Sequence, residues 1–152
     1  MFIKRPIGYS GVNAMSKFLR LMTLWLWGGF VFYCIELLWR GYSYPSMFVV
    51  GGMCFLIIGG INNYLPWSIG LVWQSLIGGA AVTVIELASG IVLNIWLGLA
   101  IWDYSHLPFN ILGQICLLYS LIWVVLSTVG IFLDDYLRWK LYGEQRPKYA
   151  LI

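Results

Sequence analysis

Four long apolar runs constrain this chain more than any other feature of its sequence. They cover residues 21–39, 45–61, 67–97 and 111–133, and a helix needs about 20 apolar residues to cross the core of a bilayer. Only 10% of the residues are charged, whereas a soluble domain carries about 25%. This composition excludes a soluble globular domain and a disordered chain. We therefore predict an all-α membrane protein, in which residues 1–152 form one domain with a four-transmembrane-helix bundle.

The third run is too long for a simple crossing. At 1.5 Å per residue, a helix over residues 67–97 would measure about 46 Å, against about 30 Å for the bilayer core. Either this helix is strongly tilted or its second half lies along the interface, and the sequence favours neither. After it, Pro108 predicts an irregular loop, which suits a re-entrant path into the bundle. Asn110 is expected to cap the fourth helix.

The basic residues give the orientation. Eight of the nine Lys and Arg residues lie in the tails 1–20 and 134–152. An even number of spans places both tails on one side, and the positive-inside rule makes that side cytoplasmic. The prediction is a multi-pass protein of the cell membrane with both termini in the cytoplasm. Because topology explains the basic tails, they indicate contact with anionic lipid and no nucleic-acid role.

In this topology several polar residues fall near the outer surface. Glu36 and Glu86 lie toward the outer ends of the first and third helices, and Gln114 lies in the first two turns of the fourth. The loop between the third and fourth helices is on the same side. We expect one polar cluster here, formed by Glu36, Glu86, Asp103, Tyr104, His106, Asn110 and Gln114.

Each member of the cluster also has a structural interpretation. Glu36 precedes Arg40 by four residues, a spacing that suits a helical ion pair as well as a functional carboxylate. Glu86 has no basic residue within one turn, so a buried Glu86 should be protonated or hydrogen-bonded to another helix. His106 is expected to be solvated or hydrogen-bonded. No metal-ligand spacing connects these residues, and we predict neither a metal nor a cofactor.

Two further patterns bear on assembly. Glycine doublets, such as Gly28-Gly29 and Gly78-Gly79, let helices approach closely and predict helix–helix contacts within the bundle, in a dimer, or both. No Gly-rich loop followed by Lys-Ser occurs, so a nucleotide-binding function has no support and transport would need a separate ATPase.

The run from Trp102 to Leu117 reads WDYSHLPFNILGQICL. It resembles the W-D-Y-S-x-x-P-F-N-x-x-G-R-I-C-L signature of the CmpB-like family, described as "putative ABC-transporter type IV". The resemblance extends over roughly residues 25 to 130, where Glu36, Glu86 and Trp123 resemble family positions. It implies a membrane component, such as a permease, but no substrate. Gln114 stands where the family has Arg, so an anion-binding role for that Arg is not carried over.

Three functions remain open at this point. The first is a small transport-related or assembly component that self-associates or joins other membrane subunits. The second is a membrane-embedded enzyme acting on a lipid or isoprenoid, with Glu86 as a general base and Asp103 and His106 orienting the headgroup. The third is a structural or regulatory bundle in which the polar cluster only ties helices together.

Overall fold

A computed structural model of the chain describes residues 14–65, 69–145 and 149–151. The fold is mostly helical with little sheet, and four helices are long and apolar enough to cross a membrane, as predicted. The elements are α1 (Ala14–Arg40), α2 (Pro45–Tyr64), α3 (Leu71–Gly90), the π-helix η1 (Ile91–Trp96), β1 (Asn110–Ile111), β2 (Ile115–Cys116) and α4 (Leu117–Tyr142).

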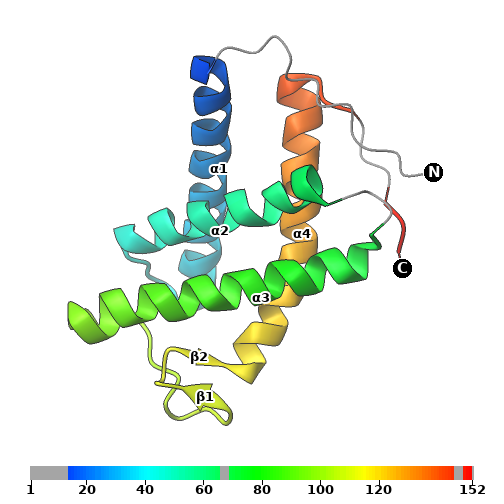
Figure 1. Cartoon of the computed structure of the whole chain (residues 1–152). Coiled ribbons are helices and arrows are strands. Elements are labelled where there is room, and N and C mark those ends of the chain that lie inside the picture. The colour runs from blue at the N-terminus through cyan, green and yellow to red at the C-terminus, as the bar shows by residue number, and fades with distance from the viewer. Residues whose placement is uncertain (1–13, 66–68, 146–148, 152) are drawn as a thin grey trace.

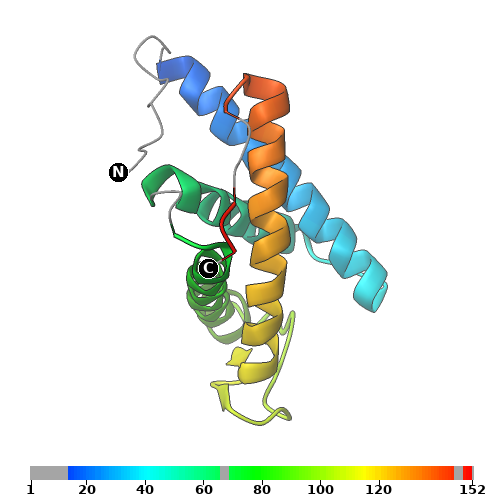
Figure 2. The same ribbon diagram turned by 90° about the vertical axis from the view of Figure 1, so that its right-hand side faces the viewer.

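The helices cross one another steeply. Figure 1 shows α2 and α3 side by side, running across α1 and α4. In Figure 2, α3 is seen almost end-on while α4 runs along the page. The prediction that Glu36 and Glu86 lie toward the outer ends of the first and third helices assumed that these helices run in one direction; α3 instead runs across α1, so that assumption is wrong. The start of α1 and the end of α4 lie at one end of the molecule, and the β1–β2 hairpin lies at the other. At the first end, the Tyr142 hydroxyl donates to the Arg20 carbonyl over 3.4 Å.

Glycines allow the closest helix contacts. A Cβ on Gly28 of α1 would come within 2.2 Å of Phe55 in α2, and one on Gly79 of α3 within 2.5 Å of Val124 in α4. The glycine contacts that the sequence predicts within the bundle are thus confirmed. They pair α1 with α2 and α3 with α4.

Little apolar surface is buried between the helices. Leu24, Val82 and Ile131 are almost fully buried, but most large apolar side chains of the described helices are exposed. For a chain in water this surface would be unstable, whereas in a bilayer it faces lipid. A separate small core of Met47, Ile101 and Trp102 holds the loop after η1 against α2.

Several boundaries differ from the predicted ones. Residues 66–68, where the third helix was expected to begin, lie outside the described residues. The fourth helix begins at Leu117 instead of residue 111, because Leu112 and Gly113 both have positive φ (53° and 67°) and turn the chain between β1 and β2. It ends at Tyr142, so residues 134–142 are helical and not part of a tail; Gly143 then closes the helix with φ 66°.

The C-terminal segment packs against the start of α3. The Leu71 N–H donates to the Ala150 carbonyl over 2.8 Å, and the Val72 N–H to that of Leu151 over 3.3 Å. The first N–H groups of a helix have no intrahelical partner, and residues 150–151 satisfy two of them here.

Candidate functional site

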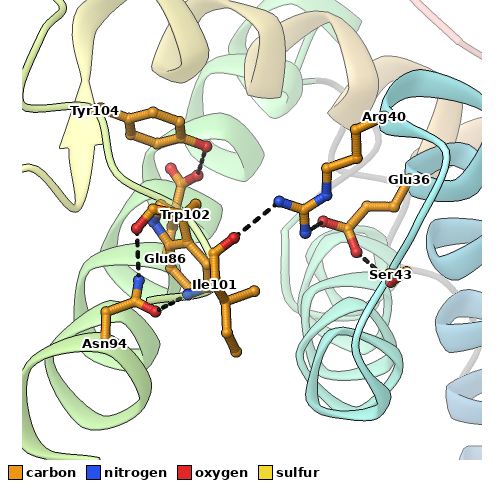
Figure 3. Close-up of polar contacts among 8 residues, drawn as sticks. All are labelled: Glu36, Arg40, Ser43, Glu86, Asn94, Ile101, Trp102 and Tyr104. Carbon is orange, nitrogen blue, oxygen red and sulfur yellow. Dashed lines mark hydrogen bonds and ion pairs between the residues drawn. The ribbon is translucent and has the colours of Figure 1, made fainter. Parts of the chain in front are cut away.

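Residues 101–104, here called the connecting segment, join several elements through polar contacts (Figure 3). The Ile101 N–H donates to Asn94 Oδ1 of η1 over 2.7 Å, and Asn94 Nδ2 donates to the Trp102 carbonyl over 3.1 Å. Arg40, at the end of α1, donates through Nη1 to the Ile101 carbonyl over 3.0 Å. One short extended stretch therefore fixes the end of α1 relative to η1.

The chain reaches this position through a turn after η1. Gly98 has φ +65° and Ala100 has φ 48°, and the Leu99 N–H donates to the Leu93 carbonyl over 3.0 Å. Left-handed conformations reverse the chain direction, and they are rare outside glycine. The Gly-x-Ala turn thus returns the chain from the end of η1 to the side of Asn94.

Glu86 is the buried carboxylate of this region. Its Oε2 accepts a hydrogen bond from Trp123 Nε1 of α4 over 2.8 Å, and its Oε1 accepts one from the Tyr104 hydroxyl over 3.1 Å. The hydrogen bond to another helix that the sequence suggested for a buried Glu86 is confirmed. The Tyr104 ring also stacks on Tyr119 with centroids 4.5 Å apart. Glu86 therefore connects α3, α4 and the connecting segment.

The pKa of Tyr104 is raised above its ordinary value. Burial of the phenol is the main cause, and the neighbouring Glu86 carboxylate adds to it. The hydroxyl of Tyr104 is therefore a hydrogen-bond donor to Glu86 at neutral pH.

The predicted ion pair between Glu36 and Arg40 is confirmed. The second oxygen of the Glu36 carboxylate accepts a hydrogen bond from the Ser43 hydroxyl. Because Arg40 also reaches the Ile101 carbonyl, Glu36 acts on the connecting segment by orienting the guanidinium. Glu36 and Glu86 lie in one region but share no direct contact in the described structure; the connecting segment lies between them (Figure 3).

Gln114 is buried, but it lies before β2 and not in α4. Its Oε1 accepts from Asn94 Nδ2 over 2.7 Å and its Nε2 donates to the Leu112 carbonyl over 3.1 Å. The Trp102 indole N–H donates to the Gln114 carbonyl over 2.9 Å. A Cβ on Gly90 would come within 2.6 Å of Gln114 Oε1. A neutral amide therefore occupies this buried position through hydrogen bonds alone.

The remaining loop residues have local roles. Asn110 does not cap α4, because the hairpin separates it from the helix; its Nδ2 donates to the Leu107 carbonyl over 2.8 Å. Asp103 and His106 are exposed. Asp103 accepts from the backbone N–H and the hydroxyl of Ser105 over 2.8 and 2.9 Å, which lowers the pKa of its carboxyl. Glu86 and Tyr104 thus meet directly, whereas Asp103, His106 and Asn110 lie apart from them.

A second buried polar group lies between α2 and α4, at the end away from the hairpin, and the sequence did not reveal it. Arg138 Nε donates to Asp134 Oδ2 over 2.6 Å, and Asn62 Nδ2 donates to Asp135 Oδ2 over 2.6 Å. Tyr149 also donates to Asp135, over 3.0 Å. The i, i+4 spacing of Asp134 and Arg138 directly after an apolar run could have indicated this ion pair. It was missed because the helix was predicted to end at residue 133.

Neither group resembles a metal centre. Among residues 14–65, 69–145 and 149–151, no three His, Cys, Asp or Glu side chains are placed to hold a metal ion. The chemical capacity of the site is that of a buried carboxylate accepting hydrogen bonds from a phenol and an indole.

A family model described as "Putative ABC-transporter type IV" matches residues 14–138. The match covers most of the chain, and the protein belongs to this family of transporter-related membrane proteins. No curated protein and no solved structure matches the chain.

Proposed function

We propose that the protein is a non-catalytic membrane subunit of a transport assembly, in which the polar cluster holds the helices in place. The observation that carries this proposal is that the carboxylates and the amide of this cluster bind partners within the chain. Glu86 has two donors, Glu36 has Arg40 and Ser43, and Gln114 has Asn94. A solute or substrate would have to displace these bonds to reach the same atoms.

An enzymatic role has less support from the geometry. A lipid-modifying site would need Glu86, Asp103 and His106 to face a common substrate. Asp103 and His106 are exposed on the loop, while Glu86 is buried against Trp123. A general base must reach the proton that it removes, and both oxygens of Glu86 already accept hydrogen bonds within the chain.

The exposed apolar helix faces support the assembly role. α1 contacts mainly α2, and most of its remaining surface between its two ends is apolar. Its large exposed side chains include Met15, Phe18, Leu26, Phe30, Leu37 and Leu38. We propose that these faces contact lipid, further copies of the chain or other membrane subunits, and that a separate ATPase supplies the energy for transport.

The proposed orientation places the hairpin outside the cell and the opposite end of the bundle, where α1 begins and α4 ends, inside it. Lys17 and Arg20 at the start of α1 lie at the same end of the molecule as Arg138 and Lys140 at the end of α4 (Figure 1). A basic end of this kind favours the cytoplasmic side. The basic residues of 1–13 and 146–148, which also entered this prediction, lie outside the described residues.

The test is the mass of the particle released from native membranes into nanodiscs, together with its ATPase activity. We expect a particle well above the 17.4 kDa of one chain, with ATP hydrolysis that co-purifies with it. A monodisperse single chain without ATPase activity would contradict the proposal.

A matched variant separates the scaffold from an enzyme. Glu86→Gln weakens the scaffold, because an amide has one acceptor oxygen where the carboxylate has two, and its N–H₂ can pair with Tyr104 only if that hydroxyl turns to accept and gives up its own acceptor. We expect a lower unfolding temperature and an unchanged membrane lipid profile. A variant of wild-type stability that altered the lipid profile would favour the enzyme instead.

A further inference from the structure

Residues 107–112, here called the tip, comprise the turn before β1, β1 itself and the first residue of the hairpin turn, and most of their apolar surface is exposed. It reads Leu-Pro-Phe-Asn-Ile-Leu and contains no ionisable residue. Phe109 is 79% exposed, Leu112 66% and Ile111 55%. Figure 1 shows β1 at the end of the molecule where α4 begins, while β2 is buried against α3 and α4. Three large apolar side chains thus stand clear of the packed part of the protein.

Two of these side chains occupy an unusual backbone conformation. Phe109 has φ 55° and Leu112 has φ 53°, in the left-handed region that bulky residues avoid and that Gly or Asn adopts more cheaply. Strained residues of this kind cluster where the conformation serves a function. Here neither side chain fills the core, so packing inside the chain does not account for its size.

The backbone polar groups of the tip find partners locally. Asn110 Nδ2 donates to the Leu107 carbonyl over 2.8 Å, and Asn110 Oδ1 accepts from the Gly113 N–H over 3.2 Å. From the other side, the backbone N–H of Gln114 donates to the Ile111 carbonyl over 3.0 Å, and its side-chain Nε2 donates to the Leu112 carbonyl over 3.1 Å. Irregular backbone does not face lipid within the hydrocarbon core, so the tip can lie no deeper than the boundary between headgroups and acyl chains. The local hydrogen bonds of Asn110 and Gln114 lower the cost of bringing the backbone to that depth.

The apolar surface continues from the tip onto the spans. Trp96 and Leu97 at the end of η1, and Leu117 and Leu118 at the start of α4, are all at least half exposed. These positions flank the loop at the ends of two candidate membrane spans. The tip therefore extends the lipid-facing surface of the helices.

We propose that residues 107–112 insert into the leaflet on their own side of the membrane and anchor the loop there, with lipid as the partner of Phe109, Ile111 and Leu112. The absence of charge in the tip suits the boundary between headgroups and acyl chains. The exposed Asp103 and His106 precede the tip and remain in water.

Spin-label accessibility tests this proposal on the full chain in nanodiscs of phosphatidylcholine and phosphatidylglycerol. Cys34, Cys54 and Cys116 are first replaced by alanine, and one label is placed by Phe109→Cys or, as the control, by His106→Cys. The Phe109 label should collide more with oxygen, which concentrates in lipid, than with a water-soluble nickel chelate. The His106 label should show the reverse order.

Two outcomes would overturn the proposal. A Phe109 label as open to the nickel chelate as the His106 label would place the tip in water. A Phe109 label shielded from both reagents would mean that protein, such as a second copy of the chain, covers the tip.

A second variant makes the test independent of strain. Asparagine tolerates positive φ, so Phe109→Asn with Leu112→Asn should preserve the hairpin while removing its apolar side chains. A spin label at Ile111→Cys in this variant should then collide more with the nickel chelate than with oxygen, while the unfolding temperature of the protein stays unchanged. A reporter that does not shift would overturn the proposal as well.

Discussion

Replacing Gly59 by alanine would place a methyl group against the carboxylate of Asp134. The added Cβ would lie 2.1 Å from Asp134 Cγ and 2.3 and 2.5 Å from its two oxygens, well inside van der Waals contact. Asp134 is fully buried and cannot rotate away freely, because Arg138 Nε holds Oδ2 at 2.6 Å. Either α2 and α4 separate or the ion pair breaks.

The structure sets the size of the effect. Forcing an extra methyl into a packed interior costs about 1–3 kcal/mol. Separating Asp134 from Arg138 would raise the cost to about 3–5 kcal/mol, because a buried charge would lose its partner. We therefore expect Gly59→Ala to lower the free energy of unfolding by about 1–5 kcal/mol, measured by reversible unfolding in mixed micelles.

Gly130→Ala is the matched control for this substitution. Gly130 lies in α4 and faces Ile58 of α2, so it probes the same pair of helices. Its Cβ would lie 3.2 Å from Ile58 Cγ2, a contact that a small side-chain shift relieves. We expect the free energy of unfolding of Gly130→Ala to lie within about 1 kcal/mol of the wild-type value. Alanine stabilises a helix relative to glycine by about that amount, which offsets the small cost of the contact.

A double-mutant cycle isolates the contact itself. Gly59→Ala should cost less in an Asp134→Ala background, because the carboxylate that it meets is gone. Equal effects of Gly59→Ala and Gly130→Ala, or an unchanged cost in the Asp134→Ala background, would refute the close packing of α2 on α4.

Three further substitutions test the polar contacts, each by unfolding in mixed micelles. Trp123→Phe removes the indole donor to Glu86 and should lower the free energy of unfolding by about 1–3 kcal/mol. In a Glu86→Leu background, the same substitution should change it very little. Tyr104→Phe should reduce the loss of stability at alkaline pH. The pKa of Tyr104 in the folded protein lies above the unfolded value of about 10. The stability that the protonated phenol contributes is therefore complete below pH 10 and is lost as pH rises above that value. An equal alkaline loss in both proteins would contradict the buried phenol. Asn62→Leu removes the 2.6 Å hydrogen bond to Asp135 and should lower the free energy of unfolding by about 1.5–3 kcal/mol. An unchanged free energy of unfolding would contradict this hydrogen bond.

Local spacing was enough to predict much of the fold. The four spans follow from run length and composition, and the Glu36–Arg40 pair from i, i+4 geometry, which is a property of one helix. The hydrogen bond from Glu86 to another helix followed from the cost of leaving a carboxylate alone in an apolar run. In these cases, neighbouring residues in the sequence or the surrounding lipid determine the structure, so the sequence alone is enough to predict it.

The missed features depend on contacts between distant residues. Asn94 interrupted an apolar run, but its bonds to Ile101, Trp102 and Gln114 exist only because the chain reverses after η1. Ala100 adopts positive φ in that turn, which no propensity of alanine predicts.

The hairpin was missed for a similar reason. The Ile-Leu pair at residues 111–112 looks like the start of an apolar helix, while Gly113 and the positive φ of Leu112 form a turn instead. Hydrophobicity alone does not distinguish these two conformations.

In the proposed topology, α4 crosses the membrane with the hairpin on one side and the basic end of the bundle on the other. Single cysteines at His106 and Gln145, on either side of α4, test this in intact cells with a membrane-impermeant maleimide. We expect the cysteine at residue 106 to be labelled from outside and the one at residue 145 to be labelled only after permeabilisation. Labelling of both from the same side would contradict it.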